Sequence, residues 1–194
     1  YNKPDENGEY DNVINSNDQK ELGEANPEWF ASWNNQFSYK NFSLSFNFYM
    51  SWGGLIWNDL KRYYSAWQGN THKQTPEYIR QGWKYPGEIT NWYALNSRER
   101  KTNNQSMSLN SMFLEDASFI RLQSVRLSYN VDEKLLSRLP INRLEVSVYG
   151  NNLLTWTNYS GFDPELGGSV LSPGKDESVY PKNREFGLGL SVGF

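Results

Sequence analysis

The sequence predicts an all-β chain that supplies about five strands of a transmembrane antiparallel β-barrel segment. Three observations support this fold class: a final segment of strict two-residue alternation, two long alternating runs joined by a short polar turn, and connections that alternate between short and long. Strict alternation indicates strands with one apolar and one polar face. Short turns at one end and long loops at the other are typical of membrane barrels.

The first two strands are predicted as a hairpin. Residues 1–27 are polar and rich in Asn, Asp and Glu, which indicates a loop. Alternating runs then cover 29–40, where Asn35 interrupts the apolar face, and 42–52. Each run is about as long as the roughly 9–11 residues that a tilted membrane strand needs. The polar turn at 40–41 therefore joins two membrane-spanning strands.

A long excursion from 53 to 117 follows the hairpin. A loop of this length inside a domain is usually functional. Residues 76–100 of the excursion are aromatic, charged and irregular. Helical spacing of apolar residues predicts a short helix over 55–67, carried by Ile56, Leu60, Tyr63 and Trp67.

Three more strands are predicted after the excursion. The third starts near Ser118 and the fourth covers 143–149, with a short helical or turn segment over 132–140 between them. A loop rich in Gly, Asn and Pro is expected from 151 to 181. The fifth strand, 184–194, ends the chain.

The fifth strand has the strictest pattern of all. Its apolar residues share one face, and its other face carries only polar residues and glycines. An ending on a terminal aromatic resembles the signal that outer-membrane β-barrels present to their assembly machinery, and here it involves Gly189, Val192 and Phe194. The apolar residues of this strand are Phe186, Leu188, Leu190, Val192 and Phe194.

Composition excludes several classes of function. The chain has 194 residues, a net charge of −3, no Cys and one His. Mild acidity argues against a nucleic-acid partner. Without Cys or a second His, neither a nitrogen- or sulfur-ligated metal site nor a Ser-His-Asp triad is supported. We therefore expect no catalytic residues, no metal and no cofactor. Aromatic residues make up 16% of the chain, which suits the two aromatic girdles of a barrel and also a carbohydrate-binding surface.

Five such strands cannot stand alone in lipid, because each open edge leaves backbone groups unpaired in hydrocarbon. We expect the remaining strands to come from the same polypeptide or from a partner. The chain begins at Tyr1 without an apolar leader. This suggests a cleaved leader or a piece of a longer chain.

Several motifs resemble the C-terminal end of the SusC/RagA-like TonB-dependent transporters of Bacteroidetes. The resemblance runs in order over most of the chain and is weak only from about 68 to 110. The matching segments are 26–29 (NPEW), 35–42 (NQFSYKNF), 113–122 (FLEDASFIRL), 149–157 (YGNNLLTWT), 161–165 (GFDPE) and 180–184 (YPKNR), down to Phe194.

The resemblance implies a barrel of about 22 strands in the outer membrane, with a plug inside it and a SusD-like lipoprotein lid on top. Such a complex imports nutrients such as oligosaccharides or peptides with energy delivered by TonB. Residues 1–194 would form the closing strands and the extracellular loops, with no plug domain and no TonB-contacting segment. TonB would act through the plug, and no nucleic acid is expected as a partner.

Aromatic residues of the excursion are the candidates for contact with ligand or lid. Aromatic rings stack on sugars and also suit protein interfaces; the alternative is that they pack the loop onto the barrel rim. Asp163 and Glu165 are interpreted as turn residues, and Lys61-Arg62 as a solvated loop face. The candidates are Trp57, Tyr63, Tyr64, Trp67, Trp83 and Trp92.

The alternative function is a soluble all-β carbohydrate-binding module whose aromatics line a cleft. The apolar faces of 42–52 and 186–194 separate the two hypotheses. In a soluble sandwich a second sheet buries these faces, whereas in a barrel they contact lipid.

Overall fold

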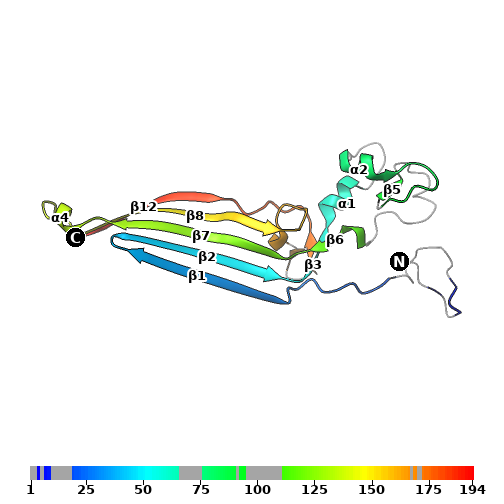
Figure 1. The fold of residues 1–194 in the computed structure, drawn as a ribbon, viewed down its shortest axis with the longest axis horizontal. Helices are drawn as coiled ribbons and strands as arrows, with labels where there is room; N and C mark the ends of the chain where they lie inside the picture. The colour runs from blue at the N-terminus through cyan, green and yellow to red at the C-terminus, as the bar shows by residue number, and fades with distance from the viewer. Residues whose placement is uncertain are drawn as a thin grey trace.

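The computed structural model describes residues 4, 7–9, 19–65, 76–90, 92–94, 111–166, 168–169 and 172–194. A long five-stranded antiparallel sheet dominates it, in the order β1-β2-β7-β8-β12 (Figure 1). The strands are β1 (Trp29–Tyr39), β2 (Phe42–Trp52), β7 (Phe119–Asn130), β8 (Arg143–Thr157) and β12 (Glu185–Gly193). The five predicted strands are thus confirmed as one sheet, and it is open, with β1 and β12 at its edges.

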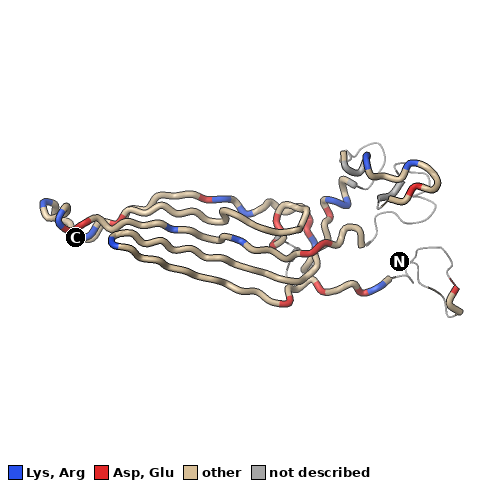
Figure 2. Tube along the Cα trace, in the orientation of Figure 1, with Lys and Arg blue, Asp and Glu red and all other residues tan. Residues whose placement is uncertain are grey.

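The β1–β2 hairpin is in the predicted register. Trp29 pairs with Trp52 and Tyr39 with Phe42, with the two-residue turn at Lys40-Asn41 between the strands. Lys40 has φ of 52°, in the left-handed region that such a tight turn requires. The two strands contain no charged residue, as the uninterrupted neutral tube in Figure 2 shows.

The sheet has two chemically distinct faces, which we call the apolar face and the polar face. Register across the strands aligns residues of one kind into rows, so Phe37, Leu44, Leu127, Val148 and Leu188 form one apolar row. The adjacent row, one residue away on each strand, belongs to the polar face and consists of Ser38, Ser43, Ser128, Ser147 and Gly189.

β8 is longer than predicted, and the expected loop from 151 is wrong for its first seven residues. The strand continues through Gly150 and Asn151 to Thr157. The pairing with β7 is irregular between Leu122 and Ser124, where β8 contains one more residue than its partner. Asn152 has φ of 52°, a conformation that Asn tolerates better than most residues. The Gly-Asn-Asn segment therefore marks a bulge and not the end of the strand.

The long loops gather at one end of the sheet, which we call the loop end (Figure 1). There β3 (Leu55–Asn58) pairs antiparallel with β6 (Leu114–Asp116) and parallel with β11 (Lys175–Asp176). The helix predicted from residue 55 begins only at Asp59, as α1 (Asp59–Ser65). Asn58 caps it, since its side-chain Oδ1 accepts a hydrogen bond from the backbone N–H of Lys61 at 2.8 Å. Ile56 and Phe113 are fully buried in this small unit.

Further short elements complete the two ends. At the opposite end, which we call the turn end, α4 (Glu133–Leu136) confirms the predicted short helical segment. No helix among the described residues is long and apolar enough to cross a membrane. The remaining elements, all at the loop end, are α2 (Pro76–Gln81), β4 (Gly82–Trp83), β5 (Trp92–Ala94), η2 (Ser111–Phe113), η3 (Pro164–Leu166), β9 (Gly168–Ser169) and β10 (Ser172–Pro173).

Candidate functional site

Aromatic residues border the apolar face at both ends. At the loop end Trp29 and Trp52 stack with ring centroids 6.2 Å apart, and Trp156 lies in the next row. At the turn end the ring centroids of Phe42 and Tyr129 lie 4.7 Å apart. Aliphatic side chains between these borders are largely uncovered: Leu188 is 82% exposed and Leu190 is 69% exposed.

The polar face carries a buried ion cluster near the loop end. Arg121 of β7 is only 3% exposed, and its Nη2 lies 2.6 Å from Asp163. Its Nη1 pairs with Glu165, and its Nε donates to Thr155 of β8 at 3.0 Å. Lys182 joins the cluster through Glu165 at 2.7 Å. The cluster ties the loop after β8 down onto the wall of the sheet.

The local sequence explains how the two acids reach Arg121. Asp163 accepts a hydrogen bond from the backbone N–H of Glu165 at 3.0 Å, which forms an Asx-type turn. Pro164 starts the short η3 helix there. The predicted turn role of Asp163 and Glu165 is therefore confirmed, but the ion pairs with Arg121 are an additional role that the sequence does not show.

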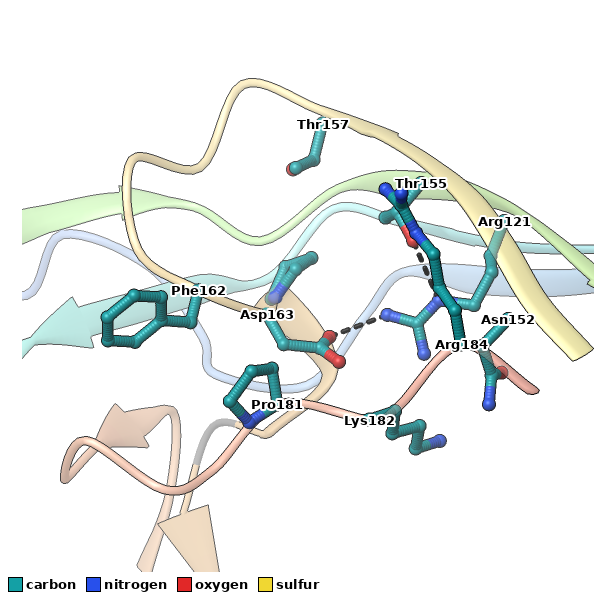
Figure 3. Close-up of a pocket in the computed structure, with 10 residues that line it drawn as sticks. Arg121, Asn152, Thr155, Thr157, Phe162, Asp163, Pro181, Lys182 and Arg184 are labelled. Carbon is teal, nitrogen blue, oxygen red and sulfur yellow. Dashed lines mark hydrogen bonds and ion pairs between the residues drawn. The ribbon is translucent and has the colours of Figure 1, made fainter.

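A pocket of about 300 Å³ opens beside this cluster (Figure 3). It lies between β7, β8 and the two arms of the loop that joins β8 to β12. Cationic side chains, hydroxyls and one aromatic ring line it. The lining residues are Arg121, Asn152, Thr155, Thr157, Phe162, Asp163, Pro164, Pro181, Lys182 and Arg184.

A second cluster joins the excursion to the loop after β8. Glu115 of β6 pairs with Lys61 of α1 at 2.8 Å and accepts hydrogen bonds from the backbone N–H and the hydroxyl of Ser160. Burial alone would raise the pKa of the Glu115 carboxyl, but the hydrogen bonds from Lys61 and Ser160 outweigh it and lower the pKa. Lys61-Arg62 are therefore not a solvated face: Arg62 in turn pairs with Asp59 at 2.5 Å.

Tyr159 forms a third tie within the same loop. Its hydroxyl donates to Asp176 of β11 at 2.6 Å, and both residues are buried. Burial, followed by the bond to the Asp176 carboxylate, raises the pKa of Tyr159, so the phenol stays protonated and remains a donor. The loop between β8 and β12 is thus attached to other elements through Arg121 and Glu115, and the bond between Tyr159 and Asp176 holds it together internally.

The structure places the aromatic candidates of the excursion in several environments. Trp57 lies in β3, packs edge-on against Phe113 at 5.7 Å and donates to Asp59 at 3.3 Å, so it is part of the small loop-end core. Tyr63 and Tyr64 of α1 contact each other at 5.4 Å and are both 41% exposed.

The other two described candidates lie farther along the excursion. Trp83 is half-buried in β4, which pairs with β5. Trp92 begins β5. Trp67 lies outside the described residues.

The residues of the expected assembly signal fall on both faces of the last strand. Val192 belongs to the apolar face and pairs with Leu144. Gly189 belongs to the polar face opposite Ser147, and a Cβ there would lie 2.5 Å from the Ser147 hydroxyl. Phe194 is 87% exposed at the turn end.

Arg121 is the principal residue that the sequence analysis missed. A lone Arg on the polar face of a strand gives no signal of its partners, which lie 42 and 44 residues further along the chain. In the part of the chain that the structure describes, no group of His, Cys, Asp and Glu is arranged to hold a metal ion.

Comparisons with known proteins identify relatives over nearly the whole chain. A TonB-dependent receptor of Formosa agariphila is 33% identical over 193 residues, which cover 98% of this chain and 18% of that receptor. Two further TonB-dependent receptors of this organism are 29% and 30% identical, each over 98% of this chain. The chain spans only 18% to 19% of the length of these relatives. No protein-family model matches it.

Solved structures agree with the sequence relatives. The RagAB peptide importer in its open-open state matches with a TM-score of 0.79 at 23% identity, over 100% of this chain and 20% of that chain. The same importer in its closed-closed state matches with a TM-score of 0.79 at 22% identity, over 99% of this chain and 20% of that chain. The open sheet accordingly corresponds to part of a larger barrel wall. The chain belongs to the TonB-dependent receptors, and its fold matches the corresponding part of the RagAB importer.

Proposed function

We propose that residues 1–194 form the closing strands and extracellular loops of a TonB-dependent nutrient importer in the outer membrane of a Bacteroidetes-type cell. One observation carries this proposal: the sheet has an uncovered apolar face directly opposite a polar face. In a barrel wall the first contacts lipid and the second lines the lumen.

The dimensions of the apolar face support a membrane position. From Tyr39 to Trp29 the strand rises by ten residue steps of roughly 3.3 Å each. With a tilt of about 40° this gives a band about 25 Å tall, which matches the apolar band of outer-membrane barrels. The aromatic borders at Trp29 and Trp52 and at Phe42 and Tyr129 then lie at the two membrane interfaces.

The open edges support assembly with further strands. Backbone groups of β1 and β12 that face away from the sheet have no strand partner among the described residues. In hydrocarbon each unpaired group costs several kcal/mol. The rest of the barrel would supply the missing strands, and Gly189, Val192 and Phe194 would form the signal for its assembly.

The importer would work with the partners that its relatives suggest. A SusD-like surface lipoprotein would cover the loop end, and TonB would act through a plug inside the barrel. The solute would be an oligosaccharide or a peptide, and a peptide is what the structurally similar RagAB importer takes up. We assign contact with the lid or the solute to Tyr63, Tyr64, Trp67, Trp83 and Trp92, and a packing role in the loop-end core to Trp57.

The proposed activity is transport and not catalysis, and the named relatives are receptors and importers. A soluble carbohydrate-binding module would need a second sheet over the apolar face. Among the described residues the smaller sheets lie at the loop end instead (Figure 1).

Adjacent residues of β7 provide the test. Val125 belongs to the central apolar row, between Phe46 and Gly150, and Ser124 faces the lumen. In the full-length receptor Val125→Arg should cost about 2–4 kcal/mol near the membrane midplane, and should abolish both insertion into the outer membrane and TonB-dependent uptake of fluorescent peptide or oligosaccharide. The matched variant Ser124→Arg should insert. Normal insertion of Val125→Arg would refute the proposal, as would uptake that persists without TonB.

A further inference from the structure

The pocket beside the Arg121 cluster has a surplus of positive charge. Arg121 and Lys182 are balanced by Asp163 and Glu165, because the pairs Arg121–Asp163, Arg121–Glu165 and Lys182–Glu165 link two cations to two carboxylates. Arg184 also lines the pocket. None of the carboxylates of the described residues forms an ion pair with it. The pocket therefore carries one uncompensated guanidinium.

Uncharged groups around the guanidinium suit a small organic anion. Arg184 and Thr155 both line the pocket (Figure 3). The Thr155 oxygen accepts from Arg121 Nε, so its own proton is left to donate. Phe162 lines the opposite side of the same pocket and is 66% exposed, so it offers an uncovered apolar surface there (Figure 3).

The surrounding structure fixes the pocket wall behind these groups. Arg121 is buried and fixed by two carboxylates and a hydroxyl. Asn152 donates to the backbone carbonyl of Asn183 at 3.2 Å, directly before Arg184. The backbone beside Arg184 is thereby fixed, and the planar fork of its guanidinium matches a carboxylate in two-point contact.

We infer that this pocket is a subsite for a carboxylate group of the transported solute, bound by Arg184 and Thr155 with an apolar or flat part of the solute against Phe162. The inference rests on the proposed function, since it is the lumen that brings solute to the polar face. If the pocket binds a carboxylate, the transported solutes are acidic molecules. The carboxylate has two possible sources: a uronic acid of an oligosaccharide, or the carboxyl group of a peptide.

The experiment compares acidic and neutral forms of the same probe on the purified full-length receptor. One pair is a trimer of galacturonic acid and its methyl ester. The other is a hexapeptide with a free terminal carboxyl group and the same peptide as its amide. We expect one acid to bind at least about tenfold more tightly than its neutral partner, as is typical of a charge-assisted hydrogen bond. The pair that shows the preference identifies the source of the carboxylate.

Variants connect the preference to Arg184. Arg184→Gln should reduce the acid-to-neutral ratio to within about twofold, while Arg184→Lys should retain part of it. Arg138→Gln is the matched control: it removes the same charge from an exposed position beyond α4 at the turn end, and should leave the ratio unchanged. Raising the salt concentration should lower the ratio for the unmodified receptor, because exposed charges are screened.

Two results would overturn the inference and leave the proposed function intact. One is a receptor that inserts and imports but shows no acid preference with either probe pair. The other is an Arg184→Gln variant whose acid-to-neutral ratio is unchanged while its resistance to unfolding falls, since the guanidinium would then serve the fold of the receptor and not the solute.

Discussion

Arg121 shows how one residue on the polar face organises a loop. Its guanidinium is buried between Asp163, Glu165 and Thr155. A buried ion pair adds little net stability by itself, but removing one partner leaves a buried charge uncompensated. The sequence predicts the turn at Asp163 from its Pro and Gly neighbours. It does not predict the pairing, because contacts over 42 residues leave no local pattern.

The first prediction concerns this cluster. Arg121→Met should destabilise the attachment of the loop between β8 and β12 by about 3–5 kcal/mol, because Asp163 is left buried and unpaired. Proteolysis of the full-length receptor should then cut within 158–184. Arg126→Met is the control. Arg126 pairs with Glu145 but is half-exposed, and such pairs are worth about 0–1 kcal/mol. Equal resistance of the Arg121 and Arg126 variants would contradict the assigned role.

The second prediction is a pH dependence at Glu115. Its pKa is lowered in the folded state from an ordinary value of 4.5. A lowered pKa gives stability that is present above the ordinary value and is lost as pH falls through the folded value. Hydrogen exchange at 54–58 and 114–117, corrected for the intrinsic pH effect, should therefore show loss of protection only below about pH 4.5.

Two substitutions check the assignment of that step. Glu115→Gln should weaken protection at neutral pH and remove the pH step, because the amide cannot pair ionically with Lys61. Glu177→Gln, in an exposed pair with Lys175, should keep the step. A step that survives Glu115→Gln belongs to another carboxyl group.

Among the elements, the last strand depends on glycines as much as on its apolar residues. Gly187 pairs directly with Tyr149 of β8, and a Cβ at position 187 would collide with the Tyr149 ring. An aromatic side chain that covers a cross-strand glycine stabilises the pairing of the two strands. The bare face of β12 is thus filled from its neighbour.

The third prediction follows from this packing. Gly187→Val should destabilise the assembled receptor by about 1–3 kcal/mol in urea unfolding, as overpacking does. Adding Tyr149→Ala should recover a measurable part of that loss. Ser191→Val, on the same face but opposite Glu145, should have a smaller effect. Additive effects of Gly187→Val and Tyr149→Ala would show that the two positions do not interact.

The sequence predicts an element well where the two-residue alternation of a strand is strict. It does so less well where helical spacing and strand pairing compete over the same residues. The hairpin limits at 29–40 and 42–52 agree with β1 and β2 because, apart from Asn35, every second residue there is apolar. The helix start was wrong because Leu55–Asn58 pair with two distant strands, which overrides their helical spacing. The capping pair Asn58-Asp59 was the available signal for the true start.

At the scale of the whole molecule, the sheet has an apolar and a polar face, and the length of its loops distinguishes its two ends. Apart from two blue segments within β7, charged residues gather toward the ends and the loops, as Figure 2 shows. The general architecture was predictable from alternation and loop lengths. The side-chain contacts that hold the loop between β8 and β12 were not, since they join residues that lie far apart in the sequence.

Alternating exposure along β12 is the most direct test of the central claim that the sheet is a barrel wall. The chain contains no Cys, so single cysteines can be placed from 185 to 193 in a full-length receptor otherwise freed of cysteine. We predict that a water-soluble maleimide labels the odd positions 185 and 191 from the lumen, and that only a lipid-soluble reagent labels 186, 188, 190 and 192. Water-soluble labelling of the even positions at the same rate as the odd ones would contradict the barrel-wall assignment.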